Sequence, residues 1–256
     1  MKTEHSDADH HAQNSFIASN ESRLILFLFG MVVRWLFRFR FASVTIKQQY
    51  SPTLEDRTIY YLNHTSWWDG ILPLLLNQTR FHQKARAVME LKQMREYGVF
   101  KFIGAFSIDL ATTKSVIRSM RYALESMKRE KASLFIYPEG KINAPADDLP
   151  KFEAGIGWLI RKCIEEGVTV RIVPIAVYTH LMSSSKPHLW VDVGTPVEGI
   201  EAILEKNQKE ETALQDLNNR IAAHLHRYLT DQLVALKQEA YATAFPSITD
   251  PEQIQQ

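Results

Sequence analysis

Short segments of β-branched and aromatic residues alternate with segments of helical spacing along most of this chain of 256 residues. Residues 58–62 and 133–137 are short and mostly apolar, which is typical of strands buried on both faces of a sheet. Residues 113–129 instead place their apolar side chains three or four positions apart, as an amphipathic helix does. This alternation predicts an α/β fold, a single domain with a mostly parallel sheet flanked by helices. The expected strands are 44–46, 58–62, 85–89, 105–108, 133–137, 170–178 and 189–193, and the expected helices are 113–129, 154–166 and 198–241.

The domain is expected to cover residues 44–243, with segments of a different character on either side. Residues 1–22 are polar and include three histidines, and this composition favours a disordered N-terminal segment over a metal-binding tract. The segment does not resemble a signal peptide, because acidic residues precede the first apolar stretch and no small-residue cleavage site follows it. Residues 244–256 carry prolines and polar side chains and are expected to form a tail.

An apolar stretch at residues 24–33 is followed by three arginines within residues 34–41. As a helix the apolar stretch is about 15 Å long, roughly half of a bilayer's hydrocarbon core. Arg23, Arg34 and Arg38 fall on one side of such a helix, and the rest of its surface is almost wholly apolar. The pattern predicts an N-terminal amphipathic membrane-associating helix over residues 23–43, and therefore a peripheral (monotopic) membrane protein on the cytoplasmic face. A buried core helix and a membrane span are the alternatives.

Composition and missing motifs argue against several functional classes. Thirty basic and twenty-nine acidic residues leave a net charge of +1, so no nucleic-acid partner held by bulk positive charge is expected. The single cysteine, Cys163, rules out an intrachain disulfide framework and a multi-cysteine zinc site. The chain also lacks the glycine-rich nucleotide loops and the Gly-x-Ser-x-Gly turn of the common serine hydrolases.

A histidine and a carboxylate follow the first fully apolar strand, at the sheet edge where open α/β folds bind ligands. His64 is followed five residues later by Asp69, and such a pair can act as a general base and the acid that orients it. Asp69 has a second interpretation, because Ser66 and Asp69 also have the spacing of a helix capping box. The pair alone therefore leaves both a catalytic and a structural role open.

A second polar cluster, Tyr-Pro-Glu-Gly at residues 137–140, closes the expected strand 133–137. Because the carboxyl ends of parallel strands meet at one edge of a sheet, this cluster and His64 are expected to share one cleft. A second His-x4-Asp pair, His226 and Asp231, lies inside the expected C-terminal helix with no strand before it. We interpret that second pair as incidental.

Four segments, taken in order, resemble the motifs of the glycerolipid acyltransferase family, which includes the 1-acylglycerol-3-phosphate acyltransferases. The first motif, Asn-His-x4-Asp, is matched by residues 63–69, and the second by Gly-Ala-Phe-Ser-Ile-Asp-Leu at residues 104–110. The third, Phe-Pro-Glu-Gly-Thr-Arg in the family, is Tyr-Pro-Glu-Gly-Lys-Ile at residues 137–142, and the fourth is matched by Ile-Val-Pro-Ile-Ala at residues 172–176. The Lys-Phe-x-x-Gly of residues 151–155 resembles the segment that often follows the third motif.

This resemblance implies the transfer of a fatty acyl group from acyl-CoA or acyl carrier protein to a hydroxyl of a lipid acceptor of the lysophospholipid type. It implies that His64 takes the proton of that hydroxyl and that Asp69 orients His64. The substrate-binding residues that the motifs imply are Gly104, Pro138, Glu139, Gly140 and Lys141. The thioester is a co-substrate, no cofactor or metal is implied, and the expected partners are membrane lipids and the acyl donor.

Two positions depart from the family pattern. Leu110 stands where the second motif usually has an arginine, and Lys141-Ile142 replaces the Thr-Arg of the third motif. Because guanidinium groups bind phosphate through two parallel hydrogen bonds, their loss opens an alternative acceptor without phosphate, such as a glycolipid, an aminolipid or an isoprenoid glycoside. A catalytically silent lipid-binding protein and a hydrolase that uses water as the acceptor are two further alternatives.

Overall fold

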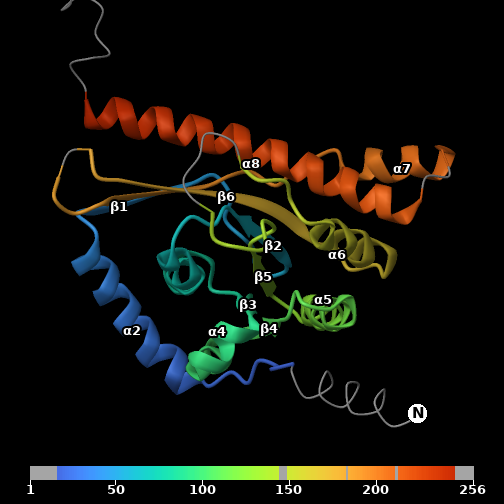
Figure 1. Ribbon diagram of the computed structural model, residues 1–256, viewed down its shortest axis with the longest axis horizontal. Helices are drawn as coiled ribbons and strands as arrows, with labels where there is room; N and C mark the ends of the chain where they lie inside the picture. Colours follow the sequence, from blue (N-terminus) through green and yellow to red (C-terminus); the bar gives the residue numbers. More distant parts are fainter. Residues whose placement is uncertain (1–15, 144–148, 183, 211–212, 246–256) are drawn as a thin grey trace, which may run out of the picture.

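A sheet of seven strands organises the protein, which a computed structural model describes for residues 16–143, 149–182, 184–210 and 213–245 (Figure 1). The strands are β1 (Ser43–Gln48), β2 (Thr58–Leu62), β3 (Lys84–Glu90), β4 (Ala105–Ile108), β5 (Ala132–Ile136), β6 (Arg171–His180) and β7 (His188–Val193). Their order across the sheet is β1-β7-β6-β2-β5-β3-β4. All neighbours run parallel except β6 and β7, which are antiparallel. The predicted single α/β domain with a mostly parallel sheet is therefore confirmed.

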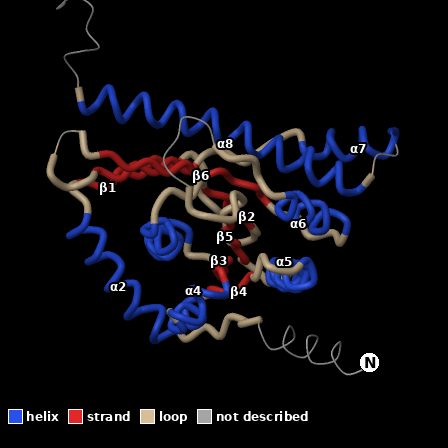
Figure 2. Tube along the Cα trace, viewed as in Figure 1, coloured by secondary structure: helices blue, strands red, loops and turns tan. Residues whose placement is uncertain are grey.

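Helices pack on both faces of this sheet (Figure 2). They are α2 (Arg23–Arg40), α3 (Leu72–Leu76), α4 (Leu91–Glu96), α5 (Thr113–Met127), α6 (Ala154–Glu165), α7 (Ile200–Glu210) and α8 (Leu214–Ala244), with single turns at Trp67–Ile71, Asn77–Phe81 and Gly98–Ile103. One apolar core, which includes Met120 and Ile156, lies between the sheet and α5, α6 and α8. The other, which includes Tyr60 and Phe135, lies on the face that α2 and α3 cover. The single helix expected over residues 198–241 is in fact two helices, α7 and α8.

Strand β3 changes its partner along its length. Its first half pairs with β5 as far as Ala87, which lies opposite Phe135. From Ala87 to Glu90 it pairs with β4 instead. Beyond Ala87 the two central strands β3 and β5 therefore diverge, and the sheet opens between them at its carboxyl edge.

The segment before α2 corrects one expectation. Residues 16–22 are not a solvated lead-in, because the backbone N–H groups of Asn20 and Ser22 donate to the carbonyls of Lys101 and Phe102, at 2.8 and 2.9 Å. The segment thus runs along the edge of the fold beside β4. Phe16 and Ile17 also pack against the two apolar cores, and these two apolar residues are too few to form a periodic pattern in the sequence. Residues 1–15 with their three histidines, and residues 246–256 of the expected tail, lie outside the described residues.

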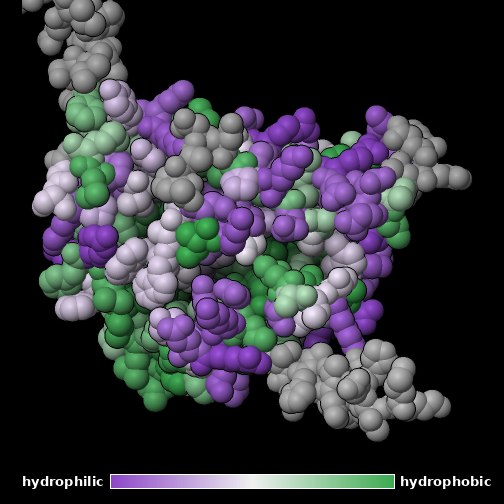
Figure 3. All heavy atoms as spheres, in the orientation of Figure 1, coloured by the Kyte–Doolittle hydropathy of each residue, from purple (hydrophilic) through white to green (hydrophobic). Residues whose placement is uncertain are grey.

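Helix α2 begins at Arg23 and ends at Arg40, three residues before the expected end. It packs on α3 through buried Val33 and Phe37, while most of its other apolar side chains are exposed and form the green surface at the lower left of Figure 3. Gly30 allows a close approach, because a Cβ there would overlap the side chain of Gln78. The alternative of a buried core helix is therefore wrong, because the outer side of α2 is exposed. Within the described part of the chain, no helix combines the length and apolarity that crossing a membrane requires.

Candidate active site

The first motif begins where β2 ends, and a buried asparagine fixes that position. Asn63 donates from its side-chain amide to the carbonyl of Val177 and accepts from the N–H of the same residue, both at 2.8 Å. These two hydrogen bonds join the end of β2 to β6. His64 therefore leaves the sheet from a backbone that is held on both sides, at the carboxyl edge that the sequence predicts.

His64 and Asp69 face each other, with 3.4 Å between Nδ1 of the imidazole and Oδ2 of the carboxylate. The side chain of Asp69 is 2 % exposed and also accepts from the backbone N–H groups of Thr65 and Ser66, both at 2.7 Å. The bond from the Ser66 N–H is one half of the predicted capping box, so Asp69 fixes the local backbone and orients His64 at once. With Nδ1–H directed at Asp69, the other ring nitrogen of His64 carries a lone pair and can accept a proton.

Tyr137 braces both members of this pair, a role that the sequence analysis missed. Its ring lies against the imidazole of His64, with 4.3 Å between the ring centroids and 31° between the planes. Its hydroxyl donates to the backbone carbonyl of Asp69. Burial raises the pKa of the Tyr137 hydroxyl well above its ordinary value, so the group stays a neutral donor. The signal that points to it is the hydroxyl at a position where the family motif has phenylalanine.

Glu139 has a structural role at the site. Its carboxylate is 5 % exposed, accepts from the backbone N–H of His64 at 3.1 Å and from the side-chain amide of Asn143, and is not part of the cavity wall. Burial raises the pKa of this carboxyl, while the two hydrogen bonds oppose that shift. In this structure the oxygens of Glu139 tie the third motif to the first, a role that the sequence does not indicate, and its contact with the acceptor stays a prediction. Asn143 strengthens the tie, since its N–H donates to the carbonyl of His64 at 2.9 Å, and no sequence signal pointed to this residue.

Gly104, another expected substrate-binding residue, has a structural role in the backbone. Its φ of +106° is in the left-handed region, and a Cβ would lie 2.6 Å from the carbonyl oxygen of Ala85. The glycine is thus required by the backbone turn before β4, and it does not line the cavity. Pro138, Gly140 and Lys141 do line it, as expected.

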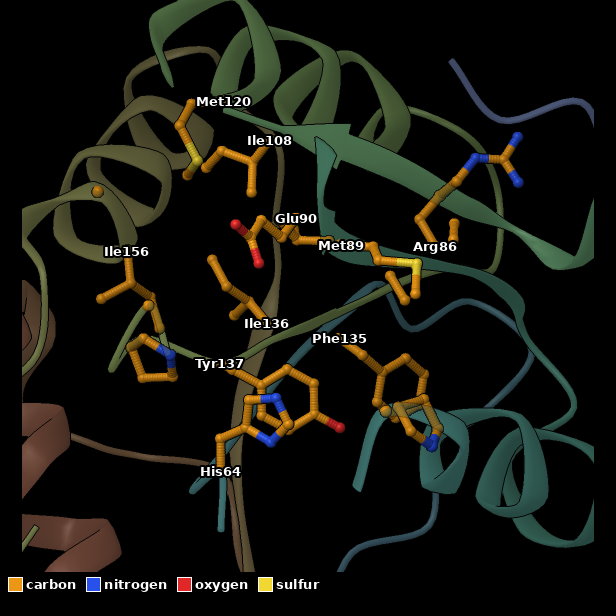
Figure 4. Close-up of a pocket in the computed structure, with 18 of the residues that line it drawn as sticks. His64, Arg86, Met89, Glu90, Ile108, Met120, Phe135, Ile136, Tyr137 and Ile156 are labelled. Carbon is orange, nitrogen blue, oxygen red and sulfur yellow. The ribbon is translucent and has the colours of Figure 1, made fainter. Parts of the chain in front are cut away.

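A cavity of about 1350 Å³ opens beside His64 (Figure 4). In Figure 4 the rings of His64 and Tyr137 lie at one side of it, below Ile136, and most of the other labelled side chains around it are apolar. The hollow in the middle of the face shown in Figure 3 is lined with apolar atoms next to α5 and α6. His64 is 16 % exposed, so a ligand in this cavity can reach it.

The cavity wall near the third motif is mostly uncharged where the family motifs have arginines. Leu110 and Ile142 line the cavity and are 52 % and 44 % exposed. Lys141, which lies between Gly140 and Ile142 in the sequence, also lines the cavity and supplies a cation. Among the described residues, no group of three histidine, cysteine or carboxylate side chains could hold a metal ion.

Together these features define a class of enzyme. In it, a histidine base that a buried aspartate orients lies beside a large, mostly apolar cavity at the carboxyl edge of an α/β sheet. The family follows from the sequence: residues 43–178, more than half of the chain, match the Acyltransferase family, and the chain belongs to it. The predicted membership of an acyltransferase family is thereby confirmed.

The chain is similar to the crystal structure of the 1-acyl-sn-glycerophosphate (LPA) acyltransferase, PlsC, from Thermotoga maritima, with 13 % sequence identity over 81 % of this chain and 79 % of that chain and a TM-score of 0.49. No curated protein matches the chain in sequence.

Proposed function

We propose that the protein transfers a fatty acyl group from a thioester, acyl-CoA or acyl carrier protein, to a hydroxyl of a lipid acceptor of the lysophospholipid type. The observation that carries this proposal is that the His64–Asp69 pair faces a large cavity with mostly apolar walls. A fatty chain gains about 0.8 kcal/mol for each buried methylene, so such walls suit an acyl substrate.

The reaction follows from the protonation states at the site. The free ring nitrogen of His64 removes the proton of the acceptor hydroxyl as the oxygen attacks the thioester carbonyl. The imidazolium that forms is stabilised by Asp69, whose carboxylate lies 3.4 Å from Nδ1. The tetrahedral intermediate then collapses, the carbon–sulfur bond breaks, and the thiolate takes the proton back from His64. A thiol has a pKa of about 8.5, so this leaving group needs little help and one base is sufficient.

The exposed side of α2 supports a place at the membrane. Phe27 and Trp35 are exposed there, alongside Arg34 and Arg38. Apolar side chains flanked by arginines suit a helix that lies in the headgroup layer of an anionic membrane. We propose that the protein is peripheral, on the cytoplasmic face, with membrane lipids as its partners.

The test is thioester consumption by the full-length protein across a panel of lysophospholipids and glycolipids, with acyl-CoA and acyl carrier protein compared as donors. His64→Ala should lower the rate by at least about 10²-fold, because it removes the general base. His226→Ala is the matched control, since His226 bonds the carbonyl of Leu149, is not among the residues that line the cavity, and should leave the rate unchanged. Wild-type turnover in the His64 variant would refute the mechanism.

A second acceptor class is favoured by one observation, the exposed Leu110 and Ile142 in the cavity wall. Neither position carries a guanidinium that would bind a phosphate group. An acceptor with a phosphate therefore gains no binding energy there over an acceptor without one, such as a glycolipid or an aminolipid. The same panel separates the two classes. Absence of turnover with every acceptor would favour a silent lipid-binding protein, and thioester loss without lipid acylation would favour water as the acceptor.

A further inference from the structure

The cavity beside His64 draws its walls from both faces of the sheet. On the face covered by α2 the apolar wall includes Leu26, Leu74, Met89, Phe100 and Phe135, which we call the α2 branch. On the opposite face it includes Val88, Ile108, Met120, Ile136 and Ile156, which we call the α5–α6 branch. In Figure 4 the labelled members of the two groups, Met89 and Phe135 for one and Ile108, Met120 and Ile156 for the other, lie on different sides above His64 and Tyr137.

The change of partner in β3 explains how one cavity reaches both faces. Successive residues of a strand point to opposite faces, so Val88 and Glu90 belong to one side of the sheet and Met89 to the other. Since β3 pairs with β5 only as far as Ala87, these three residues have no neighbour in β5. The opening left between the strands joins the two branches next to the catalytic pair.

The cavity is large. It encloses about 1350 Å³, above the roughly 300–1,000 Å³ of pockets for drug-sized molecules. The proposed reaction brings two hydrocarbon chains to His64, one on the acyl donor and one on the acceptor. The α5–α6 branch borders Leu110 and Ile117, which are exposed, so a hydrocarbon chain bound there can extend out of the protein. The acyl chain of the donor, by contrast, must lie next to the thioester carbonyl that His64 serves.

We propose that the α5–α6 branch binds the acceptor lipid's own hydrocarbon chain, while the α2 branch takes the acyl chain of the donor. The inference rests on the proposed function and adds to it a separate binding site for the acceptor chain. Two chains on opposite faces of the sheet would meet only at the opening beside His64, which brings the acceptor hydroxyl and the thioester carbonyl together.

Glu90 adds a polar requirement to this site. Its carboxylate projects between Ile108 and Ile136 in Figure 4, and it has no hydrogen bond or ion pair within the described part of the chain. Glu90 is exposed at the end of β3, so its carboxylate keeps contact with water while it lines the cavity. Such a carboxylate accepts from a hydroxyl, an amide N–H or an ammonium group and repels a phosphate, so we expect it to favour an acceptor that carries a hydrogen-bond donor.

Two small-to-large variants test the assignment of the branches. Gly155 lines the α5–α6 branch, and a Cβ there would lie 3.9 Å from the Met120 side chain, so Gly155→Leu adds bulk without a backbone clash. Ala87→Leu is the matched variant in the α2 branch, because Ala87 lines the cavity and packs on the α2 face. Each variant is assayed with monoacyl glycerophospholipids of long and short chain and, separately, with acyl-CoA of long and short chain.

Gly155→Leu should lower the long-to-short ratio of kcat/KM for the acceptor by roughly tenfold, the ratio that about two excluded methylenes give, and leave the donor ratio unchanged. Ala87→Leu should do the reverse. If both variants shift only the donor ratio, the α5–α6 branch belongs to the donor and the proposal is wrong. Wild-type protein that acylates no lipid would instead refute the proposed function.

A labelling experiment remains decisive if a variant does not fold. A lysophospholipid with a photoreactive diazirine at the end of its chain is irradiated with wild-type protein, and the labelled peptides are identified by mass spectrometry. Label on α5 and α6 supports the proposal, and label confined to α2 and α3 overturns it. Glu90→Gln completes the test: the preference for an ammonium-bearing over a phosphate-monoester acceptor should fall about tenfold, and an unchanged preference would remove Glu90 from the site.

Discussion

At the scale of single residues, Asp69 shows that a structural and a catalytic interpretation of one carboxylate need not compete. It accepts two backbone N–H groups and the Ser66 hydroxyl while its Oδ2 also faces His64. These hydrogen bonds fix the position of the carboxylate beside the imidazole, where it can stabilise the imidazolium that forms on proton transfer. The capping bonds therefore prepare the group that orients the base.

Asp69→Asn separates the two contributions. An amide keeps one acceptor oxygen but has no charge and turns a donor toward the N–H groups of Thr65 and Ser66. We expect kcat to fall by about 10²–10⁴-fold and the melting temperature to fall by a few degrees, since a lost hydrogen bond costs about 1–3 kcal/mol. Turnover and thermal unfolding are measured on the same preparation. Asp231→Asn, on the exposed side of α8, is the control, and a variant of Asp69 that loses only stability would leave it a cap alone.

Tyr137 offers a finer test, because its two contacts can be removed one at a time. Tyr137→Phe keeps the ring against His64 and loses only the hydroxyl that donates to Asp69, whereas Tyr137→Leu loses both. Phenylalanine should lower the free energy of unfolding by about 0.5–1.5 kcal/mol and kcat by less than about tenfold. Leucine should lower kcat further, since nothing then holds the imidazole plane. Equal kcat in both variants, measured at saturating substrate, would show that the ring contact has no part in catalysis.

At the scale of elements, the sequence predicts the regular parts of the fold and misses the irregular ones. Each of the seven strands lies within a few residues of its predicted range, because buried strands of a parallel sheet are apolar on both faces. The segment at residues 16–22 is held by hydrogen bonds with residues 80 or more positions later, and the turns between residues 67 and 103 are too short for a helical period. At the site, His64 and Asp69 could be predicted from their place after a strand. Glu139 could not be assigned to its tie with Asn143, because that contact joins residues only after the chain folds.

The strongest prediction at this scale is that the outer side of α2 contacts the membrane. Removing the whole helix is a poor test of that contact. Val33 and Phe37 are buried, so truncation would expose the core on that face of the sheet. Replacing Phe27 and Trp35 by serine changes only the outer side, where they are 60 % and 58 % exposed. Burying an aromatic side chain in lipid is worth about 1.5–3 kcal/mol, so the double variant should bind anionic vesicles at least tenfold more weakly in co-sedimentation.

The matched control for this pair is Leu54→Ser, which removes an even more exposed side chain from the loop between β1 and β2. It should leave vesicle binding unchanged. Binding that survives the double variant, or that falls equally in the control, would show that α2 is not the membrane-contacting element.

At the scale of the whole molecule, aromatic contacts link α2 to the elements that flank the cavity. Phe37 packs on Trp68, which contacts the exposed Trp67 beside His64. At the other end of the helix, Phe29 packs on Phe100, which also lines the cavity. Membrane contact through α2 would therefore hold the cavity and the catalytic pair close to the lipid from which a fatty acceptor comes.

This arrangement predicts that membrane binding and turnover change together. Exposed arginines on α2, among them Arg34 and Arg38, attract anionic headgroups, and salt screens that attraction within about 10 Å at moderate ionic strength. Raising the salt concentration should lower both vesicle binding and turnover of a long-chain acceptor embedded in anionic vesicles, in the same proportion. Turnover of a short-chain acceptor dissolved in water should change far less over the same range, because that substrate reaches His64 without the membrane. The contrary result is consumption of the vesicle-embedded acceptor at the original rate after high salt has released the protein from the vesicles. That result would show that the acceptor does not enter the cavity from the membrane to which α2 binds.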